Sequence, residues 1–364
     1  MRLRRLRVPL LGIGMAVACA TMAETWPPLT SPDPMPVEWV VKYVMTRYPE
    51  VHANHRRYLA ALERAVPPRQ HAWQTRILEH EAELARLHAV DHHLKLERDA
   101  RHVFYDYWYA DRAQALVTEQ RRLWDAYVPA GKAREHKGLD DPRDFMLEAT
   151  RLHGNLLKLE QERTVAWRRL NALLDRRHDA PLSVPGMKDP TPLPVDRDEL
   201  VKEALTVAPA LRQANAEVAR AEAIVEGARA QPSPERNLAA ALHELGGWQE
   251  QRRAIGAEIV REVLNLHDTA RSRRDAMTLY EQTLLPRADQ QIKRLLAGYQ
   301  AGRVDLPRLL EAYERRLDAD LELLRLRVDY EKALADLNRM RGRLPPEIER
   351  KMSAKPLNIG GSVK

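Results

Sequence analysis

The stretch PALRQANAEVARAEAIVEGA, residues 209–228, decides the fold of this sequence. Two sets of side chains repeat through it with heptad spacing, larger apolar ones at Leu211, Val218 and Val225 and alanines at Ala214, Ala221 and Ala228. Such a heptad seam is typical of helices that pack closely side by side, because alanine lets a neighbouring backbone approach. Pro209 begins the stretch, where its fixed φ suits the first turn of a helix. We therefore expect long, tightly paired helices.

The composition agrees with this expectation. The 364 residues are 30% charged and contain only 15 glycines, while Ala, Leu, Arg and Glu dominate, as they do in long-helix proteins. The single cysteine excludes an intramolecular disulfide framework and a cysteine-based zinc finger. The composition therefore predicts an all-α protein.

A second copy of the pattern lies earlier in the chain, at a constant offset. The helix start Tyr48-Pro49-Glu50-Val51 matches Ala208-Pro209-Ala210-Leu211, and 103–107 matches 263–267. Near the ends of the two copies, Leu170-Asn171 matches Leu337-Asn338 at a slightly larger offset. The chain is thus internally duplicated. We predict elongated antiparallel coiled-coil helical hairpins with little or no β-structure, whose narrow apolar stripes imply lateral partners and a homo-oligomer.

Prolines mark the boundaries between segments. Five prolines and a glycine fall within 180–194, which indicates an extended linker between the two copies. The predicted organisation is a signal peptide at 1–23, a Pro-rich lead-in at 24–36, a first helical repeat at 37–179, a linker at 180–197, a second helical repeat at 198–344 and a flexible tail at 345–364.

The N-terminus has the pattern of an export signal. Four arginines within residues 1–7 precede an uncharged stretch, 8–22, that is too short for a standard membrane span. Removal of this segment lowers the net charge from +7 to +3, with both signs interspersed. Nucleic-acid binding, which needs a clustered excess of cations, is therefore not expected.

Two cleavage sites are compatible with this signal. Thr21-Met22-Ala23 fits a simple signal peptidase site before Glu24, whereas Ala16-Val17-Ala18-Cys19 resembles a bacterial lipobox. In the second case Cys19 is a lipidation candidate and the chain is a lipoprotein, which changes its location but not its fold. In the first case Cys19 is only a small apolar residue of the signal.

The order of these motifs resembles the TolC-like outer-membrane efflux protein family, of the heavy-metal and multidrug efflux type. The two proline helix starts contribute to the resemblance, and so does 169–174. The most specific part is 284–288 followed by 297–306, where the family has a helix–turn–helix with a Tyr-x-x-Gly turn. Tyr299 and Gly302 occupy those two positions, and glycine can adopt the positive φ that a bend requires. The resemblance covers nearly all of 37–343.

The resemblance implies a homotrimer whose helices form a tunnel through the periplasm, with a periplasmic adaptor and an inner-membrane pump as partners. It further implies passive export of drugs or metal ions, an outer-membrane location, no cofactor and no catalytic residue. In the family each copy also carries a β-hairpin, and the hairpins of three subunits close into a membrane barrel. Barrel strands alternate apolar and polar residues over about 9–11 positions.

The corresponding segments of this chain, 67–96 and 231–256, do not alternate in this way. The first has apolar residues at helical spacing, and 238–245 suggests a short helix that Gly246-Gly247 would end. We expect helical connections in place of the hairpins, and hence a periplasmic location if the barrel is absent.

Histidine is the remaining chemical signal. Eight of the thirteen histidines lie between 52 and 102, and His88 and His92 share a helix face, where they could bind zinc, copper or nickel with Asp91 or Glu97. The other interpretation is an ordinary solvated helix surface, because two histidines without a defined third ligand are a weak motif.

No motif of catalysis is present. The sequence has no phosphate-binding glycine loop, no H-E-x-x-H motif and no nucleophile elbow. The aromatic cluster at 104–109 is expected to fill a helical core or a subunit contact. We predict a passive duct component of a tripartite export system, not an enzyme; the alternative is a non-transporting periplasmic coiled-coil protein with a structural or metal-binding role.

Overall fold

A computed structural model describes residues 31–66, 71–135, 142–193, 196–231 and 235–342, without the side chains of 128–148 and 235. The predicted signal peptide with Cys19, the start of the lead-in and the predicted tail lie outside the described residues. All described elements belong to a unit that begins at Pro32.

The first copy comprises α1 (Val37–Arg47), α2 (Pro49–Ala65), α3 (Ala72–Glu135) and α4 (Pro142–Leu173). Pro49 is the first residue of α2, and Tyr48 before it is extended with a ψ of 127°. A residue that precedes proline is disfavoured in the helical region, so α1 ends at this point and α2 starts anew.

The second copy repeats this scheme. It comprises α5 (Arg197–Val207), α6 (Pro209–Arg229), α7 (Glu235–Leu279), the π-helical turn η1 (Tyr280–Leu284), α8 (Leu285–Gln300) and α9 (Leu306–Met340). Ala208 is extended before Pro209, as Tyr48 is before Pro49. The side chain of Asp196 caps α5 by accepting hydrogen bonds from the backbone N–H groups of Asp198 and Glu199.

The turn η1 joins α7 and α8 into one long helical segment. Pro286 has no N–H group to donate to the preceding turn, and the N–H of Leu285 donates to the carbonyl of Tyr280. The segment 235–300 is therefore the counterpart of the uninterrupted helix α3.

Strand structure is minimal. Within the described residues it consists of β1 (Met35–Pro36) and β2 (Pro185–Gly186), which pair in parallel and bring the lead-in against the linker. The prediction of an all-α, internally duplicated fold built from helical hairpins is confirmed.

The segments that the family resemblance would assign to β-hairpins are helical. Residues 72–96 belong to α3, and 235–256 belong to α7. The prediction that the helix ends at Gly246-Gly247 was wrong, because α7 continues through both glycines to Leu279. Glycine costs only about 1 kcal/mol in a helix interior. Packing of Leu238, Ala241 and Leu245 against α6 stabilises the helix before and around this site.

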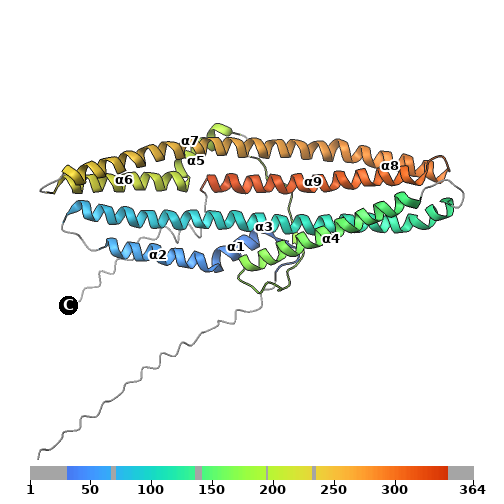
Figure 1. The fold of residues 1–364 in the computed structure, drawn as a ribbon, viewed down its shortest axis with the longest axis horizontal. Coiled ribbons are helices and arrows are strands. Elements are labelled where there is room, and N and C mark those ends of the chain that lie inside the picture. Colours follow the sequence, from blue (N-terminus) through green and yellow to red (C-terminus); the bar gives the residue numbers. More distant parts are fainter. Residues whose placement is uncertain (1–30, 67–70, 136–141, 194–195, 232–234, 343–364) are drawn as a thin grey trace, which may run out of the picture. The chain divides into compact units, whose positions relative to one another are not determined.

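The helices form parallel rows (Figure 1). One row is α7 with η1 and α8, and the next is α6 and α9 placed end to end. The following row is α3, and the last contains α2 and α4. A long helix therefore alternates with a pair of shorter helices, and the second copy supplies the first two of these rows.

Three apolar cores hold the rows together. One packs α1, α3 and α4 around Phe104 and Leu170, and a second packs α5, α7 and α9 around Val263 and Leu337. A third joins the two copies through α3, α4 and α9. The aromatic residues predicted to fill a core do so, since Phe104, Tyr105, Tyr107 and Trp108 are buried.

Candidate functional site

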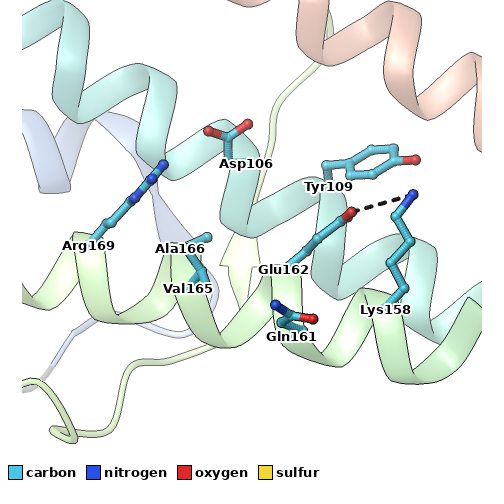
Figure 2. Close-up of a pocket in the computed structure, with 8 residues that line it drawn as sticks. All are labelled: Asp106, Tyr109, Lys158, Gln161, Glu162, Val165, Ala166 and Arg169. Atoms are coloured by element: carbon cyan, nitrogen blue, oxygen red, sulfur yellow. Dashed lines mark ion pairs between the residues drawn. The ribbon is translucent and has the colours of Figure 1, made fainter.

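A groove of about 420 Å³ runs between α3 and α4 (Figure 2). It is lined by Asp106 and Tyr109 of α3 and by one face of α4 that consists of Lys158, Gln161, Glu162, Val165, Ala166 and Arg169. The groove thus combines a small apolar wall with charges of both signs. Such a surface suits contact with another helix, and it contains no nucleophile–base pair.

The charged side chains of this groove differ in their ion-pair partners. Asp106 is ion-paired with Lys332 of α9, so its charge is already compensated. Lys158 lies 3.8 Å from Glu162 on the same helix, with both side chains largely exposed (Figure 2). An exposed pair of this kind contributes little. Lys158 is therefore available to a partner.

Two apolar side chains of α4 are exposed beside these charges. Leu157 is 55% exposed and Val165 is 41% exposed. Large apolar side chains at such positions often mark contact surfaces when they lie together. Elsewhere on α4, Arg163 donates to Asp111 at 2.9 Å and lies over the ring of Tyr107. Burial raises the pKa of Tyr107, and the charge of Arg163 opposes that shift.

The histidine candidates line a different groove, of about 490 Å³, between α2 and α3. His88 and His92 share it with Asp91, and the imidazole Nε2 of His92 lies 3.2 Å from a carboxylate oxygen of Glu50. Asp91 is paired with Lys95 and with Arg339 of α9. The structure brings these two histidines together but adds the cations Arg57 and Lys95 to the same groove.

This arrangement does not bring a third metal ligand to His88 and His92. Across the described ranges, no group of three or more His, Cys, Asp or Glu side chains is placed to hold a metal ion. Glu97, the other acid considered, is bound to Arg101 at 3.0 Å. The histidine groove is therefore a charged surface with two adjacent imidazoles.

The Tyr-x-x-Gly turn joins α8 to α9. Gly302 has a φ of 69°, and its N–H donates to the carbonyl of Tyr299. A Cβ atom on Gly298 would lie 2.6 Å from a methyl of Val304, so a larger residue there would force Val304 to shift. The ring of Tyr299 meets that of Tyr127 of α3 edge to face. This turn is consequently anchored to the first copy.

Sequence reasoning missed the cross-copy contacts of α3. This helix packs against both α6 and α9 of the second copy. Ion pairs line the contact, with α3 supplying the cation in some and the carboxylate in others, namely Arg76–Glu226, Glu81–Arg220, Glu83–Arg212, Asp91–Arg339, Arg98–Asp336 and Asp106–Lys332. An alignment of the copies cannot reveal these pairs, because they join positions that are not equivalent.

Comparison with known proteins supports the fold. No family model and no curated protein matches the sequence. Solved structures do match, including a membrane protein from Pseudomonas aeruginosa with 13% identity and a TM-score of 0.72, over 84% of this chain and 90% of that one. CusC, whose structures concern transmembrane channel formation, matches with 12% identity and a TM-score of 0.71, over 84% and 91% of the two chains.

The outer-membrane protein VceC from Vibrio cholerae matches with 13% identity and a TM-score of 0.69, over 84% of this chain and 96% of that one. These likenesses define a class, duplicated helical-hairpin proteins. Within that class the chain has the fold of the TolC-like outer-membrane channels, so the resemblance predicted from the sequence is confirmed.

None of the helices in the described part of the chain combines the length and apolar character that a membrane crossing requires.

Proposed function

We propose that this chain is a passive duct component of a tripartite export system in the cell envelope, carrying drugs or metal ions. The proposal has two supports. The fold is that of outer-membrane channels such as OprN and the Neisseria gonorrhoeae protein MtrE. In addition, the alternating rows of helices leave one specific face uncovered.

That uncovered face belongs to α7 and carries the proposal. Helix α3 is covered on one side by α2 and α4 and on the other by α6 and α9. Its counterpart α7 packs against α5, α6 and α9 of its own copy. In the described part of the chain, α2 and α4 make no substantial contact with it. Among the described helices, the row that the pattern would place next to α7 is therefore missing, and no long helix lies beside the outer face of α2 and α4.

A second chain can supply both missing neighbours. If α2 and α4 of one chain cover α7 of the next, the alternation of long helix and short pair continues without interruption. Such a head-to-tail contact generates a ring when its rotation closes. The family resemblance sets the expected size at a homotrimer, in which six copies of the repeat would surround a lumen. The turn at Tyr299 and Gly302 would lie at the end that meets the adaptor and pump.

The comparison with outer-membrane channels also bears on the cellular location of the chain. The named structures are of outer-membrane channels, which supports an envelope location for this chain. The helical form of 72–96 and 235–256 favours a duct whose described part lies in the periplasm. Cys19 remains a candidate anchor for such a duct, so palmitate labelling of wild type and Cys19→Ala is a direct test of attachment.

The duct is tested on the full-length chain extracted from cell envelopes. We expect a closed oligomer by light scattering, a ring with a hollow centre in end-on electron micrographs, and co-purification with an adaptor and pump after mild cross-linking. Conductance in planar bilayers would further show a membrane pore. A monomer recovered from the periplasm without ring, conductance or partner would contradict the duct.

The histidine groove supports a second candidate, a non-transporting periplasmic coiled-coil protein that binds metal. Its support is the pair His88 and His92 on one groove wall. Calorimetric titration with copper or zinc separates the two candidates. Affinity in the micromolar range that disappears in His88→Ala/His92→Ala, together with a monomeric protein, would favour this second role.

A further inference from the structure

The groove between α2 and α3 is rich in nitrogen donors. It has a volume of about 490 Å³, which is within the usual range for a ligand site. Asp91 is the one carboxylate among the lining residues, and the alanines beside it have small side chains that leave room between the helices. The donors come from both helices, namely Asn54, Arg57, His88, His92 and Lys95.

The two permanent cations that line the groove are held in position. The guanidinium of Arg57 donates from Nη1 to the amide oxygen of Asn54 at 3.0 Å. The ammonium of Lys95 lies 3.0 Å from a carboxylate oxygen of Asp91, one turn earlier on α3. A side chain that is already fixed loses less conformational entropy when it binds a ligand. Each helix therefore presents one preorganised cation to the groove.

The carboxylate of Asp91 does not cancel the positive charge on the α3 side. Its Oδ2 atom lies 3.0 Å from Lys95, whereas its Oδ1 atom lies 3.4 Å from the guanidinium of Arg339 on α9. Two cations thus share one carboxylate. This side of the groove keeps a surplus of positive charge.

The α2 side is positive as well. Arg57 contacts a neutral amide rather than a carboxylate. Glu50, the acid nearest to the histidines, lies 3.2 Å from Nε2 of His92, so protonation of that imidazole compensates it. His88 is exposed, and its protonation adds a further cation. Histidine takes up its proton between about pH 8 and pH 5, so acid makes the groove more positive.

The second copy shows that the fold does not require these cations. At the offset that aligns the two proline helix starts, Arg57 corresponds to Glu217 of α6. In the register at which buried positions of the two long helices recur, Lys95 corresponds to Glu258 of α7. Neither histidine of the groove is a histidine in the second copy. The same helix pair thus forms with acids at both positions, so the cations of the first copy are not needed for packing.

The chemistry of these donors suits a phosphate group. A guanidinium can bind two phosphate oxygens at once, and an ammonium binds phosphate as a point charge. Donors on two facing helices can reach oxygens that point in different directions, as those of a tetrahedral phosphate do. A metal ion suits the groove less well, because the fixed cations repel it and the described residues bring no third ligand to the two histidines.

We propose that the groove between α2 and α3 is a binding site for a phosphate group, contacted by Arg57 from one helix and by Lys95 and His88 from the other. A phospholipid headgroup and a soluble phosphate ester offer the same chemistry. The site does not depend on the proposed duct. It gives the first copy a binding role that the second copy lacks.

Phosphorus NMR of inorganic phosphate tests this site. The full-length chain with Cys19→Ser, which cannot carry a lipid on that residue, is titrated into phosphate, and line broadening gives the dissociation constant. Arg57→Ala and Lys95→Ala should each weaken binding about tenfold, as the loss of one hydrogen bond to a charged group implies. The matched control is Arg56→Ala, which removes the same charge from the next residue of α2, an exposed side chain outside the groove, and should leave binding unchanged.

Vesicle flotation distinguishes the two sources of phosphate. If the chain binds phosphatidylglycerol vesicles, and Arg57→Ala but not Arg56→Ala releases it, the ligand is a lipid headgroup. If the chain broadens the phosphate signal but does not float with vesicles, the ligand is a soluble phosphate ester. Both results support the site.

Two results would overturn it. In one, the chain binds neither inorganic phosphate nor the vesicles. In the other, Arg56→Ala weakens binding as much as Arg57→Ala, which would indicate a general attraction of anions to a positive surface. Circular dichroism of each variant confirms that the helices are intact. The ring and its partners are measured separately, so a failure of this site is distinguishable from a failure of the duct.

Discussion

Helix α3 and the segment α7–η1–α8 occupy the same place in the two copies, yet their environments differ. The buried side chains of α3 include aromatics and cover two faces, because rows of helices flank it on both sides. Those of α7 form one narrow stripe that faces its own copy. Duplication of a sequence therefore does not duplicate its surroundings.

This difference explains how the two sequences diverged. Burial aligns Ala100 with Val263 and Tyr107 with Ala270, three residues later than the sequence match of 103–107 with 263–267. In this structural register the aromatics at 104, 105 and 107 of α3 correspond to His267, Asp268 and Ala270 of α7. A helix between two rows can bury large rings on two faces, whereas in α7 the counterparts His267 and Ala270 are buried and Asp268 is exposed. The four predictions below test that contrast, and they are ordered from the largest expected effect to the smallest.

Truncation of Phe104 should have the largest effect. Its side chain is fully buried in the core of the first copy, so Phe104→Ala removes a large apolar group and leaves a cavity. We expect a loss of about 4 kcal/mol in the free energy of unfolding, measured by urea denaturation. The counterpart change His267→Ala should cost about 1 kcal/mol. Equal losses would show that the two long helices are buried to the same degree.

Removal of Glu331 should have the second largest effect. This buried carboxylate of α9 accepts hydrogen bonds from the N–H of Thr191 in the linker at 3.0 Å and from the hydroxyl of Tyr105 in α3. Burial and the charge of Glu331 raise the pKa of Tyr105. Glu331→Ala leaves buried donors unpaired and should cost about 3 kcal/mol.

Two further variants sharpen this test. Glu331→Gln keeps an acceptor for Thr191 and should cost less than Glu331→Ala. Glu311→Ala on the exposed face of the same helix, where the carboxylate pairs with Arg315, should change stability by less than about 0.5 kcal/mol. A loss at Glu331 no larger than that at Glu311 would mean that the linker is not held by this carboxylate.

Substitution of two glycines by alanine should change the stability of the chain in opposite directions. A Cβ atom on Gly227 of α6 would lie 2.7 Å from the ring of Trp73 on α3, so Gly227→Ala should destabilise the contact between the copies by about 2 kcal/mol. Gly246 of α7 has no atom within 4 Å of an added Cβ, and Gly246→Ala should stabilise the chain by about 0.5–1 kcal/mol. Thermal unfolding of both variants measures the contrast. Stabilisation by Gly227→Ala would contradict the close packing of α6 on α3.

Much of the fold was predictable from local patterns. The heptad seam of 209–228 and the two proline helix starts predict tightly paired helices and their boundaries, because both depend on neighbours in the sequence. The continuation of α7 through Gly246-Gly247 was not predictable, since packing against α6 outweighs the preference of glycine for a helix end. The same limit applies to the pair Asp106–Lys332, which joins helices from different copies that are far apart in the sequence.

The candidate groove was less accessible to sequence reasoning. Tyr299, Gly302, His88 and His92 stand out as motifs, but Leu157 and Lys158 belong to no motif. Their signal was the repeat itself, because Leu324 and Arg325 are the counterparts that contact α3. This correspondence can be recognised only once the offset between α4 and α9 is known, which is the offset that matches Leu170-Asn171 with Leu337-Asn338. A chemical motif can be recognised alone, whereas a contact surface needs its partner.

The last prediction concerns the contact between α2 and α3. His93 is buried in α3, and its Nδ1 is 2.6 Å from the carbonyl of Ala89. Burial lowers the pKa of His93, the hydrogen bond to Ala89 opposes this shift, and the charges of His92, His55 and His52 add to it. The equivalent place in the second copy, between α6 and α7, has no such cluster, since Arg212, Asn215 and Gly256 replace His52, His55 and His93.

The folded chain therefore resists protonation of His93 more strongly than the unfolded chain does. The unfolded state binds more protons as the pH falls through the ordinary histidine pKa of about 6.5, so stability should decrease from pH 7.5 to pH 5. His93→Gln should flatten this slope in urea denaturation at each pH, whatever its effect on stability at pH 7.5. His153→Gln, an exposed histidine of α4, is the matched control and should leave the slope unchanged. An identical slope in both variants would mean that the acid sensitivity arises from groups other than His93.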